Sequence, residues 1–124
     1  MRRRRPTPRR RDAPRWVDRE WADATIALLR RSKGLCECCG TDLRGRGERH
    51  HRVRRRDGGD RLSNLCLLLP GHHANAHTAP AHARETGVIV LSTLDPATQP
   101  ILHHGKRWVL LDDDGGVTPC DPPG

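Results

Sequence analysis

Residues 50–77 read "HHRVRRRDGGDRLSNLCLLLPGHHANAH", and this stretch decides how the chain folds. It opens with two adjacent histidines in an arginine cluster and ends in a second histidine group. The run "RHHRVRRR" has no helical apolar period and is predicted to form a short, exposed strand. "DGGD" indicates a turn, and "RLSN" fits a single helical turn. The leucines that follow are expected to lie in the hydrophobic core, and "HHANAH" is predicted to be helical. The histidines therefore fall on a strand and on a helix.

The histidine spacing predicts a metal site. His73 and His77 are four residues apart, so on a helix they share one face and can bind the same ion. His50 can reach that ion if the strand packs across the helix. His51 is then free of metal, and a neutral imidazole beside a metal-bound phosphate can take a proton from water. Adjacent strand residues point to opposite faces, so we predict a twist or bulge that lets both histidines address one phosphate.

Length and composition limit the number of domains, the size of the core and the location of the protein. A chain of 124 residues predicts one domain. Apolar residues make up 34%, with no Phe or Tyr, so the thin core is expected to need a metal or disulfide staple. No apolar run has the length of a membrane span, and the N-terminus lacks the apolar region of a secretory signal, so a cytoplasmic protein without a membrane partner is expected. In that setting the five cysteines indicate metal ligands or free thiols before disulfides.

The positive charge is concentrated in two segments. Residues 1–15 carry a net charge of +7 and residues 44–56 carry +6, within a chain total of +8. Two basic segments on an otherwise acidic chain favour a localised nucleic-acid contact. The first segment, rich in Pro and Arg, is expected to be disordered in the free protein.

The remaining segments predict further elements. A helix is expected from about 18 to 32, with Asp18 as N-cap and Gly34 as its end. Thr78 is expected to cap a short helix that ends at Gly87. "VIVLS", "PILHH" and "RWVLLDD" predict a small antiparallel meander over residues 88–111, with a hairpin turn at "GK".

The tract "HHRVRRRDGGDRLSNL…HHANAH" resembles the HNH endonuclease motif, in the form common in phages and actinobacteria. That family pairs an acidic residue or His with a His, followed by Asn and then His-x-x-x-His. Here these positions fall, with gaps of thirteen, nine and four residues, on His50, His51, Asn64, His73 and His77. The resemblance covers roughly residues 20–117 and implies an α+β fold, with a ββα-metal, treble-clef-like core.

The resemblance also implies how the chain divides. The expected parts are a disordered basic arm at 1–15, an HNH nuclease core with its preceding helix at 16–87, a C-terminal β-meander packed on the same domain at 88–117, and a ragged tail at 118–124.

What the resemblance implies about function is metal-dependent hydrolysis of DNA phosphodiester bonds. His51 would be the general base, and Asn64 would orient the loop and the base. His50, His73 and His77 would bind one divalent cation, with Mg, Mn, Ni and Zn all compatible. Exposed arginines would hold DNA phosphates and set affinity more than sequence choice; the expected contacts are Arg52, Arg54, Arg55 and Arg56.

Cys36-x-x-Cys39 looks like half of a zinc knuckle. Many HNH relatives complete it with a second C-x-x-C, whose positions here hold Leu69 and His72. One interpretation is a structural zinc held by Cys36, Cys39 and His72 with Cys66 as a fourth ligand, and the other is a decayed site whose two cysteines only form a tight turn. Cys38, adjacent to a ligand, is not expected to bind, and Cys120 is expected to be a spectator.

Double-stranded DNA is the expected partner. Phage relatives often act with terminase subunits during genome packaging, and others serve restriction or homing. One alternative is a non-catalytic, zinc-stapled DNA-binding module, which explains the charge and the cysteines but gives no role to His51 and Asn64. A single-strand binder, which stacks bases on aromatic side chains, is disfavoured because the chain has only three tryptophans.

Overall fold

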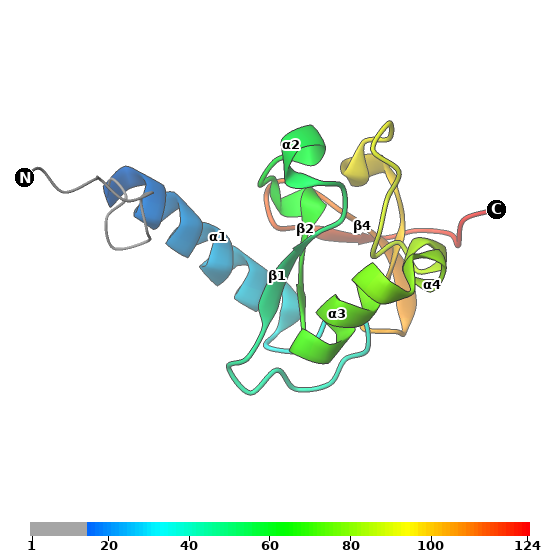
Figure 1. Ribbon diagram of the computed structural model, residues 1–124, viewed down its shortest axis with the longest axis horizontal. Coiled ribbons are helices and arrows are strands. Elements are labelled where there is room, and N and C mark those ends of the chain that lie inside the picture. The colour runs from blue at the N-terminus through cyan, green and yellow to red at the C-terminus, as the bar shows by residue number, and fades with distance from the viewer. Residues whose placement is uncertain (1–14) are drawn as a thin grey trace, which may run out of the picture.

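The computed structural model describes residues 15–124, with side chains from residue 22 onward. The arm predicted to be disordered therefore lies outside the described residues, except for Arg15. The described chain combines helices with two small antiparallel sheets, which confirms the α+β class. Figure 1 shows helix α1 (Arg15–Ser32) projecting from the body that holds both sheets. No helix in the described part of the chain is long and apolar enough to cross a bilayer.

Helix α1 matches the first predicted helix and differs at its start. It begins at Arg15, so Asp18 lies inside the helix and is not its N-cap. The helix ends where expected, at Gly34, whose φ is +73° and whose N–H donates to the Leu29 carbonyl at 3.2 Å. A left-handed residue at this position favours glycine and satisfies a carbonyl of the last turn. Leu28 is fully buried and anchors α1 to the body.

Strands β1 (Glu48–His51) and β2 (Leu65–Leu68) form an antiparallel pair. The register is continuous, with His50 opposite Cys66 and with no extra residue in either strand. The bulge or twist predicted at the two histidines is therefore wrong. A regular ladder sends His50 and His51 to opposite faces of the strand.

The connection between these strands is held by one asparagine. It contains the short helix α2 (Arg55–Gly58) and the 3-10 turn η2 (Leu62–Asn64), so the predicted strand stops early and the single turn predicted before β2 is confirmed. Asn64 is fully buried, and its Oδ1 accepts the Val53 N–H at 2.7 Å. Its Nδ2 donates to the carbonyls of Val53 and Gly59, each at 2.9 Å. These three bonds fix the path of the chain after β1.

Two helices follow β2. They are α3 (Pro70–Thr78) and α4 (Pro80–Glu85), in the two regions where helices are predicted. Thr78 does not cap α4, because its hydroxyl donates back to the Ala74 carbonyl of α3 at 3.4 Å. Within α3 only Ala76 is buried, and no side chain caps the start of the helix. Apolar packing therefore does little to hold α3 in place.

The second sheet contains β3 (Ile101–His103), β4 (Arg107–Leu111) and β5 (Val117–Pro119), in that order. The hairpin predicted between the first two strands is confirmed, but its turn is centred on His104 and Gly105, one residue before the predicted "GK", because the Lys106 N–H bonds to the His103 carbonyl at 3.0 Å. His104 and Gly105 both have positive φ, as a type I′ turn requires.

The segment "VIVLS", residues 88–92, does not form the predicted strand. Two of its backbone N–H groups bond to carbonyls outside any strand. The Ile89 N–H bonds to the Ala83 carbonyl at 3.0 Å, and the Val90 N–H bonds to the Arg52 carbonyl at 2.9 Å. Conversely, β5 extends past residue 117 into the segment predicted to be a ragged tail.

The hydrophobic core lies among α1, β2 and the second sheet. Its side chains are aliphatic apart from cysteines, and the largest members are Leu28, Leu43, Leu65, Leu67, Leu68, Ile101, Val109 and Leu111. Because so few large side chains fill it, buried polar groups contribute to holding the elements together.

One of these polar groups is the carboxylate of Glu37, which is fully buried. It accepts two hydrogen bonds from Arg31, at 2.9 and 2.8 Å, one from the His103 ring at 2.8 Å and one from the Leu67 N–H at 2.9 Å. Burial acts to raise the pKa of Glu37, but the His103 bond and the Arg31 charge outweigh it and hold the pKa below its ordinary value. The ionised carboxylate joins α1, β2 and β3.

We expect Glu37→Gln to lower the free energy of unfolding by about 3 kcal/mol, because the buried Arg31 guanidinium loses its counter-charge. The folded-state pKa of Glu37 lies below the unfolded-state value, so its contribution is complete above the unfolded value and disappears as the pH falls through the folded one. Urea denaturation at several pH values measures both effects. Glu85→Gln, the same change on an exposed side chain, is the control. Equal stabilities for the two variants at neutral pH would contradict the role assigned to Glu37.

Candidate functional site

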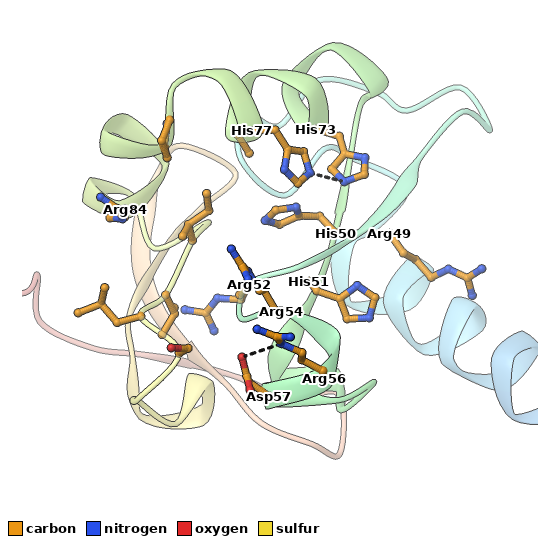
Figure 2. Close-up of a pocket in the computed structure, with 16 residues that line it drawn as sticks. Arg49, His50, His51, Arg52, Arg54, Arg56, Asp57, His73, His77 and Arg84 are labelled. Carbon is orange, nitrogen blue, oxygen red and sulfur yellow. Dashed lines mark hydrogen bonds and ion pairs between the residues drawn. The ribbon is translucent and has the colours of Figure 1, made fainter.

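Three imidazoles from two elements converge beside β1. His50 comes from β1, and His73 and His77 come from α3, one helical turn apart. One ring nitrogen from each lies within 4.8 Å of the others, and the ring centroids are 5.1–5.9 Å apart. Figure 2 shows the three rings turned toward one another. This is the juxtaposition that the spacing of the histidines in the sequence implies.

Two of the rings are held by acceptors on their outer side. The Val88 carbonyl lies 2.8 Å from Nε2 of His50, so that nitrogen donates and Nδ1 keeps its lone pair. A Glu48 carboxylate oxygen lies 3.1 Å from Nδ1 of His73, which leaves Nε2 of that ring facing Nε2 of His77 at 3.4 Å. Metal-binding histidines usually donate their second N–H to a carbonyl or carboxylate in this way. The group can therefore hold a divalent ion.

The protonation of His50 suits this role. Burial lowers the pKa of His50 to about 4, and the neighbouring His73 and His77 act in the same direction. The ring is therefore neutral at neutral pH, and its free nitrogen is available to a cation.

The three rings open onto a basic cavity of about 700 Å³. His51 also lines it, although its ring leaves the opposite face of β1 from that of His50. Nε2 of His51 lies 2.8 Å from a carboxylate oxygen of Asp60. The cavity wall includes several guanidinium-bearing residues, as Figure 2 shows: Arg49, Arg52, Arg54, Arg56 and Arg84. A positively charged hollow of this kind attracts polyanions.

The four arginines predicted to contact phosphate divide into two groups. Arg54, Arg55 and Arg56 are exposed. Arg52 is not, because its side chain is only 1% exposed and burial lowers its pKa to about 10. The prediction that Arg52 contacts phosphate is therefore wrong.

Arg52 instead joins the C-terminal half of the chain to the first sheet by hydrogen bonds to backbone carbonyls. Its guanidinium donates to five carbonyls, including one in the 3-10 turn η3 (Pro96–Thr98). These acceptors lie at 2.8–3.5 Å and belong to Ser63, Gly87, Pro96, Gln99 and Pro100. Arg49 and Arg84, which the sequence did not single out, line the cavity, and only the fold brings them there.

Asn64 lies behind the cavity rather than in it. Its side chain is fully buried, and all of its hydrogen bonds go to the backbone of Val53 and Gly59. It therefore fixes the loop that follows His51 and does not touch the imidazoles. This matches the expectation that Asn64 orients the loop, whereas its expected effect on a catalytic base stays a prediction.

A second cluster of metal-binding side chains lies at the start of α3. Its donor atoms lie within 4.8 Å of one another and belong to Cys36, Cys38, Cys39 and His72. The Cys36 and Cys38 sulfurs lie 3.4 Å apart, and Nδ1 of His72 lies 3.3 and 3.2 Å from them. These four residues can hold a metal ion.

The composition of this cluster corrects two predictions. Cys66, proposed as the fourth ligand, lies in β2 opposite His50 and is outside the group. Cys38, expected not to bind, takes that place. The reason is a tight turn: the Gly40 N–H bonds to the Cys36 carbonyl at 2.7 Å with φ of +80° at Gly40, and the turn gathers the three thiols.

The thiols influence one another strongly. A hydrogen bond from Cys38 lowers the pKa of Cys36 to about 4 against the effect of burial, and His72 and the Leu69 N–H add to the decrease. The same interaction raises the pKa of Cys38. Without a cation the turn thus favours one thiolate, and a bound cation would favour the deprotonated form of the other thiols.

Comparisons of this chain with protein-family models, with curated proteins and with solved structures find no match. What the site can do therefore follows from its own donors, charges and geometry.

We expect Cys38→Ser to weaken metal binding at the cysteine cluster by more than about tenfold, because it replaces a thiolate ligand. Cys66→Ala should leave binding unchanged, since Cys66 is outside the cluster. Titration with Co²⁺, followed through its thiolate charge-transfer absorption, measures both, with zinc displacing the probe. Loss of metal binding in Cys66→Ala but not in Cys38→Ser would show instead that Cys66 is the fourth ligand, as the sequence predicted.

Proposed function

We propose that this chain is a metal-dependent endonuclease of the HNH type that hydrolyses phosphodiester bonds of DNA. In this proposal β1, β2 and α3 are the two strands and the helix of a ββα-metal core. The observation that carries it is the convergence of His50, His73 and His77, with His51 on the same cavity wall. A DNA-binding module would need neither the three imidazoles nor a fourth beside them.

The residues divide the chemistry between them. His50, His73 and His77 would hold one divalent cation, which supplies positive charge that stabilises the phosphoryl group and the leaving oxygen. His51 would remove a proton from water as the water oxygen attacks phosphorus in line. The P–O3′ bond would then break, the O3′ leaving group would take a proton from solvent water, and the products would be a 5′-phosphate and a 3′-hydroxyl.

The cavity wall accounts for substrate binding. Arg49, Arg54, Arg56 and Arg84 would contact phosphate oxygens, and Arg55 lies exposed beside them. Such contacts give affinity without reading the base sequence and weaken as salt rises. The substrate in this proposal is duplex DNA. The resemblance to phage nucleases extends the proposal to genome packaging beside terminase subunits, in the cytoplasm of a bacterium or of a phage-infected host.

The donor set bears on the choice of cation. Three imidazoles without a carboxylate favour zinc or nickel over magnesium and manganese, which prefer oxygen ligands. The Glu48 carboxylate lies beside this site, and its hydrogen bond to His73 engages it there.

The cysteine cluster fits a structural zinc in the same scheme. Three sulfurs and one imidazole are a common zinc ligand set. His72 and His73 are neighbours on α3, so an ion at the cysteines would also fix the helix that carries two ligands of the three-histidine site. This cluster is the feature that also favours the second candidate function, a non-catalytic zinc-stapled DNA-binding module.

Plasmid nicking with single ions added to metal-stripped protein tests the proposal. We expect His51→Ala to lower cleavage by about a hundredfold or more, because water loses its proton acceptor. Its affinity for DNA should stay that of the wild type. His77→Ala should lose both cleavage and ion binding at this site.

His82→Ala is the matched control, since His82 is exposed on α4 and belongs to neither cluster. It should cleave as the wild type does. If no ion supports nicking, or if His51→Ala cleaves normally, the nuclease proposal is wrong. Intact DNA binding without nicking would then favour the binding module.

A further inference from the structure

His51 has a partner that the proposed reaction does not yet use. Nε2 of its ring lies 2.8 Å from Oδ1 of Asp60, with the His51 side chain 23% exposed and that of Asp60 34% exposed. An ionised carboxylate only accepts hydrogen bonds, so Nε2 is the nitrogen that donates. The lone pair of the His51 ring is then on Nδ1.

The Asp60 carboxylate and the backbone beside it are each bonded to a neighbouring side chain. Its second oxygen, Oδ2, accepts a hydrogen bond from Nε of Arg55 at 3.2 Å and forms an ion pair with Nη2 of the same guanidinium at 3.1 Å. The residue before it, Gly59, gives its carbonyl to the buried Asn64 side chain at 2.9 Å. Asn64 also fixes Val53, close behind His51, by two hydrogen bonds. Asp60 and His51 are thus tied to the same rigid point of the fold.

We propose that Asp60 is a positioning residue for the reaction, and that it fixes both the orientation and the tautomer of His51. The inference rests on the proposed function. Asp60 keeps the proton on Nε2, so that Nδ1 can receive the proton of the attacking water. The Nε2–H stays with the Asp60 carboxylate throughout, and the carboxylate charge stabilises the positive ring that forms.

A surface ion pair without this role would have different consequences. Exposed ion pairs contribute little to stability, and a carboxylate that bonds no imidazole does not set a ring tautomer. Asp57 provides the comparison within the same loop. It lines the same cavity, and its carboxylate lies 3.9 Å from Nε of the exposed Arg56.

Two measurements on Asp60→Ala test the inference, with Asp57→Ala as the control for the first of them, the tautomer measurement. Long-range ¹H–¹⁵N NMR reports which nitrogen of each histidine is protonated, and His51→Ala assigns the His51 signals. The wild type and Asp57→Ala should show the Nε2–H form at His51, and Asp60→Ala should show a mixture of tautomers. Cleavage kinetics should show kcat lowered by about ten- to a hundredfold in Asp60→Ala, with KM and Ni²⁺ affinity unchanged. Asp60→Glu, which keeps a carboxylate, should recover part of kcat.

The outcomes separate the two proposals. If the wild type cleaves and Asp60→Ala keeps the wild-type kcat, the role of Asp60 is refuted while the nuclease proposal stands. An unchanged His51 tautomer in Asp60→Ala would refute it as well. If the wild type does not cleave DNA with any of the added ions, the proposed function fails. A tautomer shift in Asp60→Ala would then show that Asp60 holds the ring for structural reasons alone, which overturns its part in a reaction.

Discussion

The rest of the structure depends on one buried carboxylate. Glu37 takes hydrogen bonds from α1 through Arg31, from β2 through a backbone N–H and from β3 through His103. A buried charge is costly unless its hydrogen bonds are satisfied, so the four bonds to Glu37 hold these elements in their relative positions. Glu37 also directly follows Cys36, and its own carbonyl accepts the His104 N–H at 2.7 Å. The turn that gathers the cysteines is thereby fixed to the core before any ion binds.

Helix α3 shows how a chain with a small core places a helix that carries candidate metal ligands. Ala76 is its one buried residue, so its position depends on polar donors on two of its faces. His72 reaches the cysteine cluster, whereas His73 and His77 reach His50, because successive residues on a helix point about 100° apart. The sequence indicated that a small core without Phe or Tyr needs a staple. The structure provides two candidate metal sites that meet on this one helix.

The parts of this fold that could be predicted are those set by local sequence. The i,i+4 spacing of His73 and His77, the glycine that ends α1 and the turn between β3 and β4 depend on nearby residues. The predictions that were wrong concern features that depend on residues distant in the sequence. Arg52 resembles its exposed neighbours in sequence, but its acceptors come from residues 63 to 100. Cys38 becomes a candidate ligand only through the conformation of its turn, and "VIVLS" has the composition of a strand while its N–H groups find partners outside any sheet.

The regular strand at His50 and His51 resolves the tension that led to the predicted bulge. A bulge would have placed both rings on one face, where both would compete for the same ion. The regular ladder instead buries His50, whose desolvated ring stays neutral and can act as a ligand. His51 is left on the more open side, where water and Asp60 can reach its two nitrogens. In the proposed reaction, the alternation of an ordinary strand is therefore what separates the metal ligand from the base. Both residues still line one cavity.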